Sequence, residues 1–301
     1  MPAYRGEISR KNAANSRPPR RQLSHLVSTM RPSAHRKVPN RPGAGHATGK
    51  GLRSAAMSNR QPWKAGPPQY DADHLAVWGK NLGFMSDPRF LSAYRRGINS
   101  GHKIGEAYGL GDDLSIEWRV HTCCWAGIHA KRLPGDFVEC GVNTGIYSLA
   151  VCEYTDFNKT GKRFWLFDTF NGIPEQQMSE RERKLRGGEN PRMYPDCFEL
   201  ARRNFAAFPA ATLVRGIVPD TLRTVPIERV CYLSLDMNIA APERAAIEYF
   251  WPKLVPGAIV ILDDYAWSGY EEQKTAMDGF AAVAGVQVLT LPTGQGILLK
   301  A

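Results

Sequence analysis

Aspartates follow two buried apolar runs of the chain, in positions where their carboxylates would meet. Asp236 comes directly after the run 230–235, and Asp263 and Asp264 follow the run 258–262. Neighbouring strands lie about 4.8 Å apart, so carboxylates at their ends can converge on one point. Close carboxylates repel one another unless a cation lies between them, and an all-oxygen set favours Mg²⁺ or a similar hard ion. The pattern predicts a metal site at these three residues, with helix capping as the alternative.

A glycine-containing loop follows an earlier apolar run and is the second candidate for chemistry. The run 137–140 leads into Gly141, Asn143 and Gly145. A dinucleotide-binding turn needs G-x-G-x-x-G so that the backbone can approach a pyrophosphate, but Asn143 and Ile146 occupy the second and third glycine positions. The loop suits a cofactor whose amino-acid and ribose parts pass close to the backbone, as those of S-adenosylmethionine (SAM) do. We therefore predict cofactor contacts here, with two simple turn glycines as the alternative.

The next apolar run, 163–167, ends in Asp168 and Thr169. Ligands of open parallel sheets bind beyond the carboxyl ends of the strands. A carboxylate at that place can accept hydrogen bonds from both ribose hydroxyls of a cofactor. We predict cofactor contacts at Asp168 and Thr169; the alternative is an aspartate that caps the following helix or turn.

Other polar residues carry weaker signals. His121 and His129 lie in a predicted helix over 115–132, and either His102 or His121 is a candidate proton acceptor if it faces the cleft. The stretch 174–195 is polar, charged and glycine-containing. Its position after a strand predicts a mobile lid over the substrate, and a surface insertion is the alternative.

Apolar runs and helical patterns alternate from residue 135 onward. Most runs are continuous, which is typical of strands buried on both faces of a sheet. Helical patterns, among them 242–254 and 270–284, separate the strands and predict a doubly wound, mostly parallel sheet. Four residues separate the last two runs, too few for a parallel crossover, so these form an antiparallel hairpin. The seven predicted strands are 137–140, 163–167, 212–215, 230–235, 258–262, 286–291 and 296–299.

The formal net charge of +10 is unevenly distributed. Residues 1–66 hold 14 of the 39 Lys and Arg and one acid, which gives +13, and the other 235 residues hold 25 bases and 28 acids, which gives −3. A basic nucleic-acid-binding domain is therefore excluded, and we predict a disordered basic tail over 1–66 that binds nucleic acid weakly if at all.

No apolar run approaches the roughly 18 residues of a membrane span. Six irregularly spaced cysteines indicate a reducing cytoplasm.

Five ordered motifs resemble those of the macrocin O-methyltransferase (TylF-type) family of class I SAM-dependent methyltransferases. The resemblance implies a Rossmann-like methyltransferase domain over 135–301. The apolar pattern between Leu82 and Tyr94 and the predicted helix over 115–132 indicate a helical segment over 67–134 that precedes this domain and packs on it. The terminal hairpin agrees with the class I layout. The motifs are GDFVECGVNTG (135–145), LFDTFNGIPE (166–175), LVRGIVPDTL (213–222), YLSLD (232–236) and VPGAIVILDDY (255–265).

The resemblance also implies roles for particular residues. Members use SAM and a divalent ion to methylate a hydroxyl, often on the sugar of a glycosylated natural product. The motif match puts Glu139, Gly141 and Asp168 near the cofactor, and the three aspartates described above at the metal. The family commonly has a second aspartate, a proposed general base, where this chain has Asn238.

The leading hypothesis is a SAM-dependent O-methyltransferase that acts on a hydroxyl of a sugar or another polyhydroxylated small molecule. Asp236, Asn238 and His121 are the catalytic candidates, and Mg²⁺ would lower the pKa of the acceptor hydroxyl. This hypothesis leaves a homodimer open. The alternative, motivated by Asn238, is a non-catalytic SAM-binding or scaffold module tethered by the basic tail. A nicotinamide oxidoreductase is disfavoured by the glycine loop and the terminal hairpin.

Overall fold

The computed structural model describes residues 66–188 and 190–301, so the predicted basic tail lies outside the described residues except for Gly66. In this part of the chain the strands form a two-stranded antiparallel ribbon and a seven-stranded sheet. The ribbon consists of β1 (Tyr70–Ala72) and β2 (Leu75–Val77). The strands of the sheet are β3 (Asp136–Cys140), β4 (Phe164–Asp168), β5 (Ala211–Arg215), β6 (Val230–Leu235), β7 (Leu254–Leu262), β8 (Leu289–Thr290) and β9 (Gly296–Leu299).

The order of the strands confirms the predicted doubly wound sheet. It runs β5-β4-β3-β6-β7-β9-β8. Strands β3 to β7 pair in parallel, whereas β9 pairs antiparallel with both β7 and β8. The chain starts in the middle at β3, winds outward to β5, and returns to β6 on the other side of β3. Ligands of such sheets bind at the point where the winding reverses, which lies here between β3 and β6.

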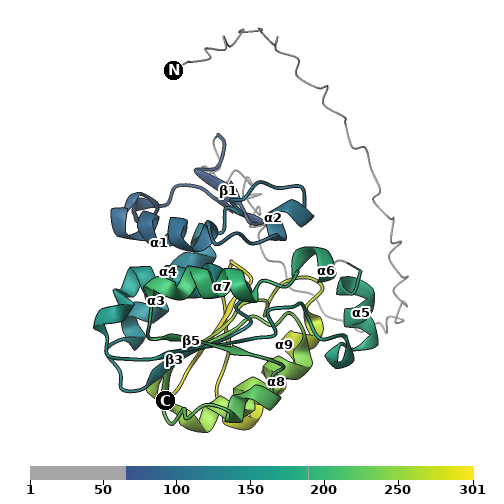
Figure 1. The fold of residues 1–301 in the computed structure, drawn as a ribbon. Coiled ribbons are helices and arrows are strands. Elements are labelled where there is room, and N and C mark those ends of the chain that lie inside the picture. The colour runs from purple at the N-terminus through teal and green to yellow at the C-terminus, as the bar shows by residue number, and fades with distance from the viewer. Residues whose placement is uncertain (1–65, 189) are drawn as a thin grey trace, which may run out of the picture. The chain divides into compact units, whose positions relative to one another are not determined.

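Helices cover both faces of the sheet. Figure 1 shows α3 and α4 on one side and α8 and α9 on the other. Because the chain winds in opposite directions from β3 and from β6, right-handed crossovers place the connecting helices on opposite faces. The helices are α1 (Pro88–Ile98), α2 (Ile104–Ala107), α3 (Glu117–Ala130), α4 (Ile146–Thr155), α5 (Glu180–Arg186), α6 (Asn190–Met193), α7 (Phe198–Asn204), α8 (Ala240–Phe250) and α9 (Glu271–Ala284), and the short 3-10 helices are η2 (Gly83–Ser86), η3 (Phe157–Lys159), η4 (Glu175–Gln177), η5 (Phe205–Ala207), η6 (Asp220–Arg223) and η7 (Trp251–Lys253).

The central strands form the core. Every residue of β6 is buried, as are the last four of β3. The ring of Phe137 stacks on that of Tyr232 with 4.9 Å between their centroids, and Phe164 meets both rings edge-on. Burial of such aromatic side chains, together with the aliphatic ones around them, stabilises the packing of the sheet against its helices. The strand ends therefore form a rigid base for the side chains that follow them.

Some predicted boundaries and elements differ in the structure. The strand predicted from residue 258 begins at Leu254, because Leu254 and Val255 are buried and Leu254 pairs with Val230. The helix predicted to 254 ends at Phe250, since Pro252 follows. The strand predicted over 286–291 keeps only β8, an exposed edge. The segment 67–134 begins with the ribbon of β1 and β2 rather than with a helix.

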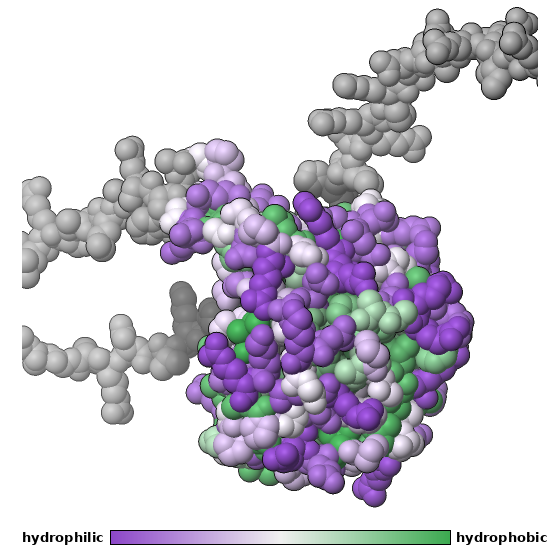
Figure 2. Space-filling model, turned by 60° about the vertical axis from the view of Figure 1, so that its left-hand side comes forward, coloured by the Kyte–Doolittle hydropathy of each residue, from purple (hydrophilic) through white to green (hydrophobic). Residues whose placement is uncertain are grey.

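The surface is of mixed polarity. Figure 2 shows one face on which hydrophilic residues predominate, with hydrophobic residues between them. In the part of the chain that the structure describes, no helix has both the length and the apolar character that a membrane span requires. All six cysteines are free and buried, as the sequence led us to expect of reduced thiols, while the predicted compartment stays a prediction.

Candidate functional site

A cavity of about 220 Å³ opens at the carboxyl ends of β3, β4, β6 and β7. It lies where the winding of the sheet reverses, as the strand order requires. The loops after these four strands form its floor, and residues between α2 and α3 together with 193–195 form its walls. Among the predicted site residues that line it are Gly141, Asn143, Asp168, Thr169, Asp236, Asn238, Asp263 and Asp264.

The loop after β3 is held against the end of β6 by a glycine. Gly141 has φ +90°, and a methyl group at its Cα would run into the backbone carbonyl of Asp236. Asn143 also takes a left-handed conformation, with φ +50°. The absence of a side chain at residue 141 therefore brings the loop close to Asp236 after β6, and it leaves backbone facing the cavity.

Asp168 braces the same loop. Its Oδ2 accepts hydrogen bonds from the backbone N–H groups of Val142 and Asn143 at 2.6 and 2.7 Å, and its Oδ1 accepts one from the N–H of Phe170 at 2.5 Å. Thr169 donates its hydroxyl to the carbonyl of Gly172 at 2.6 Å. Both residues line the cavity as predicted, but the hydrogen bonds that they make fix the shape of the loops.

The three aspartates meet at the cavity floor. One carboxylate oxygen from each of Asp236, Asp263 and Asp264 lies within 4.8 Å of the others. Burial, followed by the charge of Asp264, raises the pKa of Asp236 to about 8, and burial also raises the pKa of Asp264. The Oδ2 of Asp264 is buried without a hydrogen-bond partner. An orphaned buried oxygen within an all-oxygen donor set fits a hard divalent cation.

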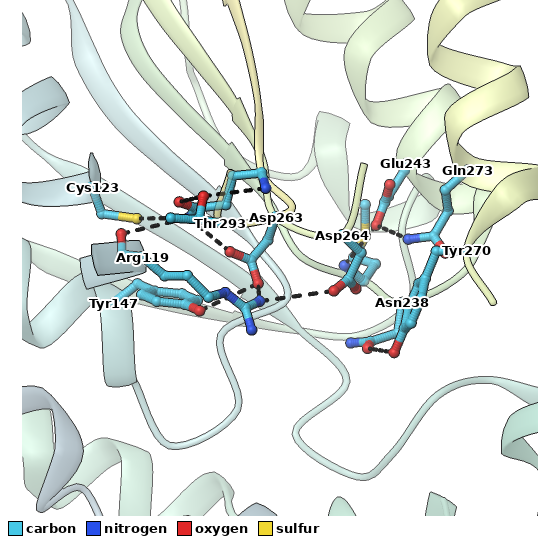
Figure 3. A network of polar contacts seen from close by, with 12 residues as sticks. Arg119, Cys123, Tyr147, Asn238, Glu243, Asp263, Asp264, Tyr270, Gln273 and Thr293 are labelled. Carbon is cyan, nitrogen blue, oxygen red and sulfur yellow. Dashed lines mark hydrogen bonds and ion pairs between the residues drawn. The ribbon is translucent and has the colours of Figure 1, made fainter. Parts of the chain in front are cut away.

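Arg119 supplies a positive charge at this cluster, which the sequence analysis did not find. It extends from α3, and its Nη2 bonds the Oδ2 of Asp263 and lies 3.8 Å from the Oδ1 of Asp264 (Figure 3). Asp263 also accepts hydrogen bonds from the Tyr147 hydroxyl at 3.3 Å and the Gln295 amide at 2.9 Å. The sequence contained one signal for this contact, because Arg119 is a charged residue in a helix that is otherwise largely apolar.

Asn238 lies between two tyrosines. Its Oδ1 accepts hydrogen bonds from the hydroxyls of Tyr270 at 3.3 Å and Tyr194 at 3.5 Å, and its φ is +63°. Burial raises the pKa of both phenols, so they stay protonated and act as donors at neutral pH. Neither tyrosine was predicted, because they come from segments about 44 and 32 residues away along the chain.

The structure does not bring three of the predicted residues to the cavity surface. Glu139 is buried within β3, where burial holds its pKa well above its usual range. Gly145 faces the ring of Phe205. His121 stacks on Phe84, with 4.0 Å between the ring centroids, and burial lowers its pKa. The predicted roles of these residues stay predictions.

The segment 174–195 covers one side of the cavity and is attached to the core. Glu182 is buried, and its Oε1 accepts a hydrogen bond from the backbone N–H of Ala240 at 2.7 Å, at the start of α8. Ser179 donates its hydroxyl to Glu272 at 2.6 Å. The predicted position over the cleft is thus observed, and the predicted mobility stays a prediction.

Sequence comparisons relate this chain to one family. The family model described as macrocin-O-methyltransferase (TylF) matches residues 119–289. The chain is 32% identical over 152 residues to a Streptomyces olivaceus protein named 8-demethyl-8-(2,3-dimethoxy-alpha-L-rhamnosyl)-tetracenomycin-C 4'-O-methyltransferase, covering 48% of this chain and 58% of that protein. It is 25% identical over 146 residues to a mycinamicin III 3''-O-methyltransferase of Micromonospora griseorubida, covering 44% and 56%. The chain spans a little over half the length of these curated relatives.

A comparison of folds agrees with the sheet topology. The solved structure of the O-methyltransferase NovP superimposes with a TM-score of 0.59 at 20% identity, covering 70% of this chain and 98% of that chain. At this identity the likeness shows the fold alone.

Proposed function

Because the chain belongs to the macrocin-O-methyltransferase (TylF) family, we propose that it transfers a methyl group from SAM to a hydroxyl of a sugar or another polyhydroxylated small molecule. The relatives in Streptomyces olivaceus and Micromonospora griseorubida are named for O-methylation of antibiotics, the first of them rhamnosylated. Their names support a small-molecule acceptor for this chain.

One observation carries the proposal. A single cavity joins the glycine-bent loop after β3 to the carboxylates after β6 and β7. The first feature leaves room for a ligand that runs close to the backbone, and the second can fix an oxygen-rich ligand beside it. A methyl-transfer site needs both, because donor and acceptor must be held in line.

The loop is the proposed cofactor site. Gly141 and Asn143 would bind the cofactor along the backbone, and Asp168 holds their loop in place through two backbone N–H groups. The sulfonium of SAM supplies an electrophilic methyl group. The contribution of these residues is to orient it, and the Thr169 hydroxyl, fixed by Gly172, shapes the neighbouring wall.

The acidic cluster is the proposed site of a divalent cation such as Mg²⁺. Asp236 and Asp264 have carboxylate oxygens available, and Asp263 completes the set if it releases Arg119. A cation held by these carboxylates would lower the pKa of an acceptor hydroxyl bound to it. Asn238 cannot take a proton at neutral pH, and its amide, with the hydroxyls of Tyr194 and Tyr270, is suited to orient the acceptor by hydrogen bonds.

The experiment has two stages on the full chain. Calorimetry with S-adenosylhomocysteine tests the cofactor site, and transfer of labelled methyl from SAM to a panel of rhamnosides and other glycosides tests the reaction. We expect Asp236→Asn to lower the transfer rate at least a hundredfold, whereas Asp220→Asn, which changes an exposed aspartate on η6, leaves it unchanged.

Each result decides between the hypotheses. Absence of cofactor binding at millimolar concentration contradicts the proposal at its first step. Cofactor binding without transfer to any acceptor of the panel favours the alternative of a SAM-binding module without catalysis. If neither EDTA nor Asp236→Asn changes the rate of methyl transfer, the proposed cation site is wrong.

A further inference from the structure

Arg119 occupies the place in which a cation would meet Asp263. Its side chain is only 15% exposed, and its guanidinium bonds one carboxylate of the cluster and approaches a second. The ring centroids of Tyr147 and Trp267 lie 5.8 and 5.6 Å from its central carbon. Such aromatic walls favour a cation held away from bulk water.

Both carboxylate oxygens of Asp263 accept hydrogen bonds in this arrangement. Its Oδ2 accepts bonds from Arg119 and from the Tyr147 hydroxyl (Figure 3). Its Oδ1 accepts one from Gln295. An oxygen with two donors has no lone pair left for another cation. In contrast, Asp264 keeps a buried oxygen without a partner. Asp263 thus has a direct ion pair with Arg119, whereas Asp264 lies 3.8 Å from the guanidinium and keeps one oxygen without a partner.

We propose that Arg119 is a resident counter-cation of the acidic cluster, and that a divalent ion has to displace it from Asp263 before all three carboxylates can bind the ion. This inference rests on the proposed function, because it takes the cluster to be the cation site. In this inference Arg119 is a positioning residue, and it competes with the divalent ion for the carboxylate of Asp263.

A second carboxylate is placed to receive the displaced guanidinium. Asp73 lies in the turn between β1 and β2; burial raises its pKa, and the nearby charge of Arg119 opposes that rise. The neighbouring His74 packs edge-on against Trp267, with 5.3 Å between the ring centroids. The turn of the ribbon, which carries Asp73, therefore lies near the guanidinium, since His74 and Arg119 both pack on Trp267.

The competition has a thermodynamic consequence. A guanidinium within about 4 Å of a bound dication repels it strongly in a buried site, so the ion must either move Arg119 or bind weakly. The ribbon then becomes part of ion binding, because Asp73 stabilises the displaced position. When no ion is bound, Arg119 neutralises part of the negative charge of the cluster, and this limits the repulsion between the carboxylates.

The test is a calorimetric titration of the full chain with Mn²⁺, a hard divalent ion. We expect Arg119→Met to bind Mn²⁺ at least tenfold more tightly than the unchanged chain, and Arg119→Gln, which keeps a donor but not the charge, to do the same. Asp73→Asn, which keeps Arg119, should bind at least threefold more weakly. Arg244→Met is the matched control, since Arg244 bonds Glu248 and the carbonyl of Ala276 rather than the cluster, and it should change the affinity by less than threefold.

The outcomes separate this inference from the proposed function. Equal or weaker Mn²⁺ binding by both Arg119 variants overturns it, as does the absence of Mn²⁺ binding in every variant. An unchanged affinity in Asp73→Asn overturns the role of the ribbon. Binding of S-adenosylhomocysteine is measured on the same samples: its loss with the Mn²⁺ pattern intact contradicts the methyltransferase and not the competition.

Discussion

Replacement of Glu243 by glutamine should change how stability depends on pH. Glu243 lies in the first turn of α8 and is buried, and its Oε1 accepts hydrogen bonds from the N–H of Met237 at 3.0 Å and from the amide of Gln273 at 2.9 Å. These bonds join α8 and α9 to the loop that carries Asp236 and Asn238. Glutamine keeps an acceptor oxygen at this place and cannot ionise.

The magnitude follows from the pKa of Glu243, which burial raises from 4.5 to about 8. The native state holds this proton more tightly than the unfolded chain, so the stability due to neutral Glu243 is complete below 4.5 and is lost as the pH rises towards 8. At about 1.4 kcal/mol per pKa unit, the loss between about pH 5 and pH 9 is about 4 kcal/mol. The Glu243→Gln variant escapes this loss, because its amide has no proton to release in this range.

Urea unfolding of both proteins at several pH values measures the effect. The difference in free energy of unfolding between Glu243→Gln and the unchanged chain should grow in favour of the variant by about 4 kcal/mol from about pH 5 to pH 9. Buried acids whose charges do not act on Glu243, such as Glu139, cancel in this difference because both proteins contain them. A change below about 1 kcal/mol would refute the reasoning, since Glu243 would then ionise in the native state as easily as in the unfolded chain.

Three further predictions concern the walls of the cavity. Gly141→Ala should weaken binding of S-adenosylhomocysteine at least tenfold by calorimetry, because the methyl group meets a backbone carbonyl, whereas Gly111→Ala, where a methyl meets open space, should not. Asp168→Asn should lower the free energy of unfolding in urea by about 1–3 kcal/mol, because one amide oxygen cannot replace the carboxylate that holds two loops; an unchanged midpoint contradicts this. Glu182→Ala, which frees the N–H of Ala240, should speed tryptic cleavage within α5 at least threefold, and an unchanged rate would show that this bond does not hold the segment.

The strands were predictable because a strand that is buried on both faces of a sheet is a continuous apolar run in the sequence. The runs 230–235 and 296–299 coincide with β6 and β9, since each is a continuous apolar stretch bounded by polar residues or turns. The edge of the sheet was less predictable. The run over 286–291 is apolar, but the end of α9 and the turn before β9 leave only Leu289 and Thr290 in register with a partner.

The acidic cluster was predictable for a related reason. Asp236 directly follows one strand, and Asp263 and Asp264 are the first two residues after the next. Because adjacent parallel strands end at the same edge of the sheet, these positions in the sequence place the carboxylates close together. The same argument found Asp168. It could not show that the carboxylate of Asp168 is engaged by backbone N–H groups, because those bonds depend on the path of the loop after β3.

The sequence by itself determined the class of fold, the position of most strands along the chain and the acids at their ends, because each of these depends on the polarity of a few consecutive residues. The tertiary structure alone decided which side chains from distant elements reach that edge. Arg119 lies 144 residues from Asp263 along the chain, and spacing does not reveal such a contact. Packing of α3 against the sheet brings its guanidinium to the carboxylates, and the same packing turns His121 towards Phe84 and away from the cavity.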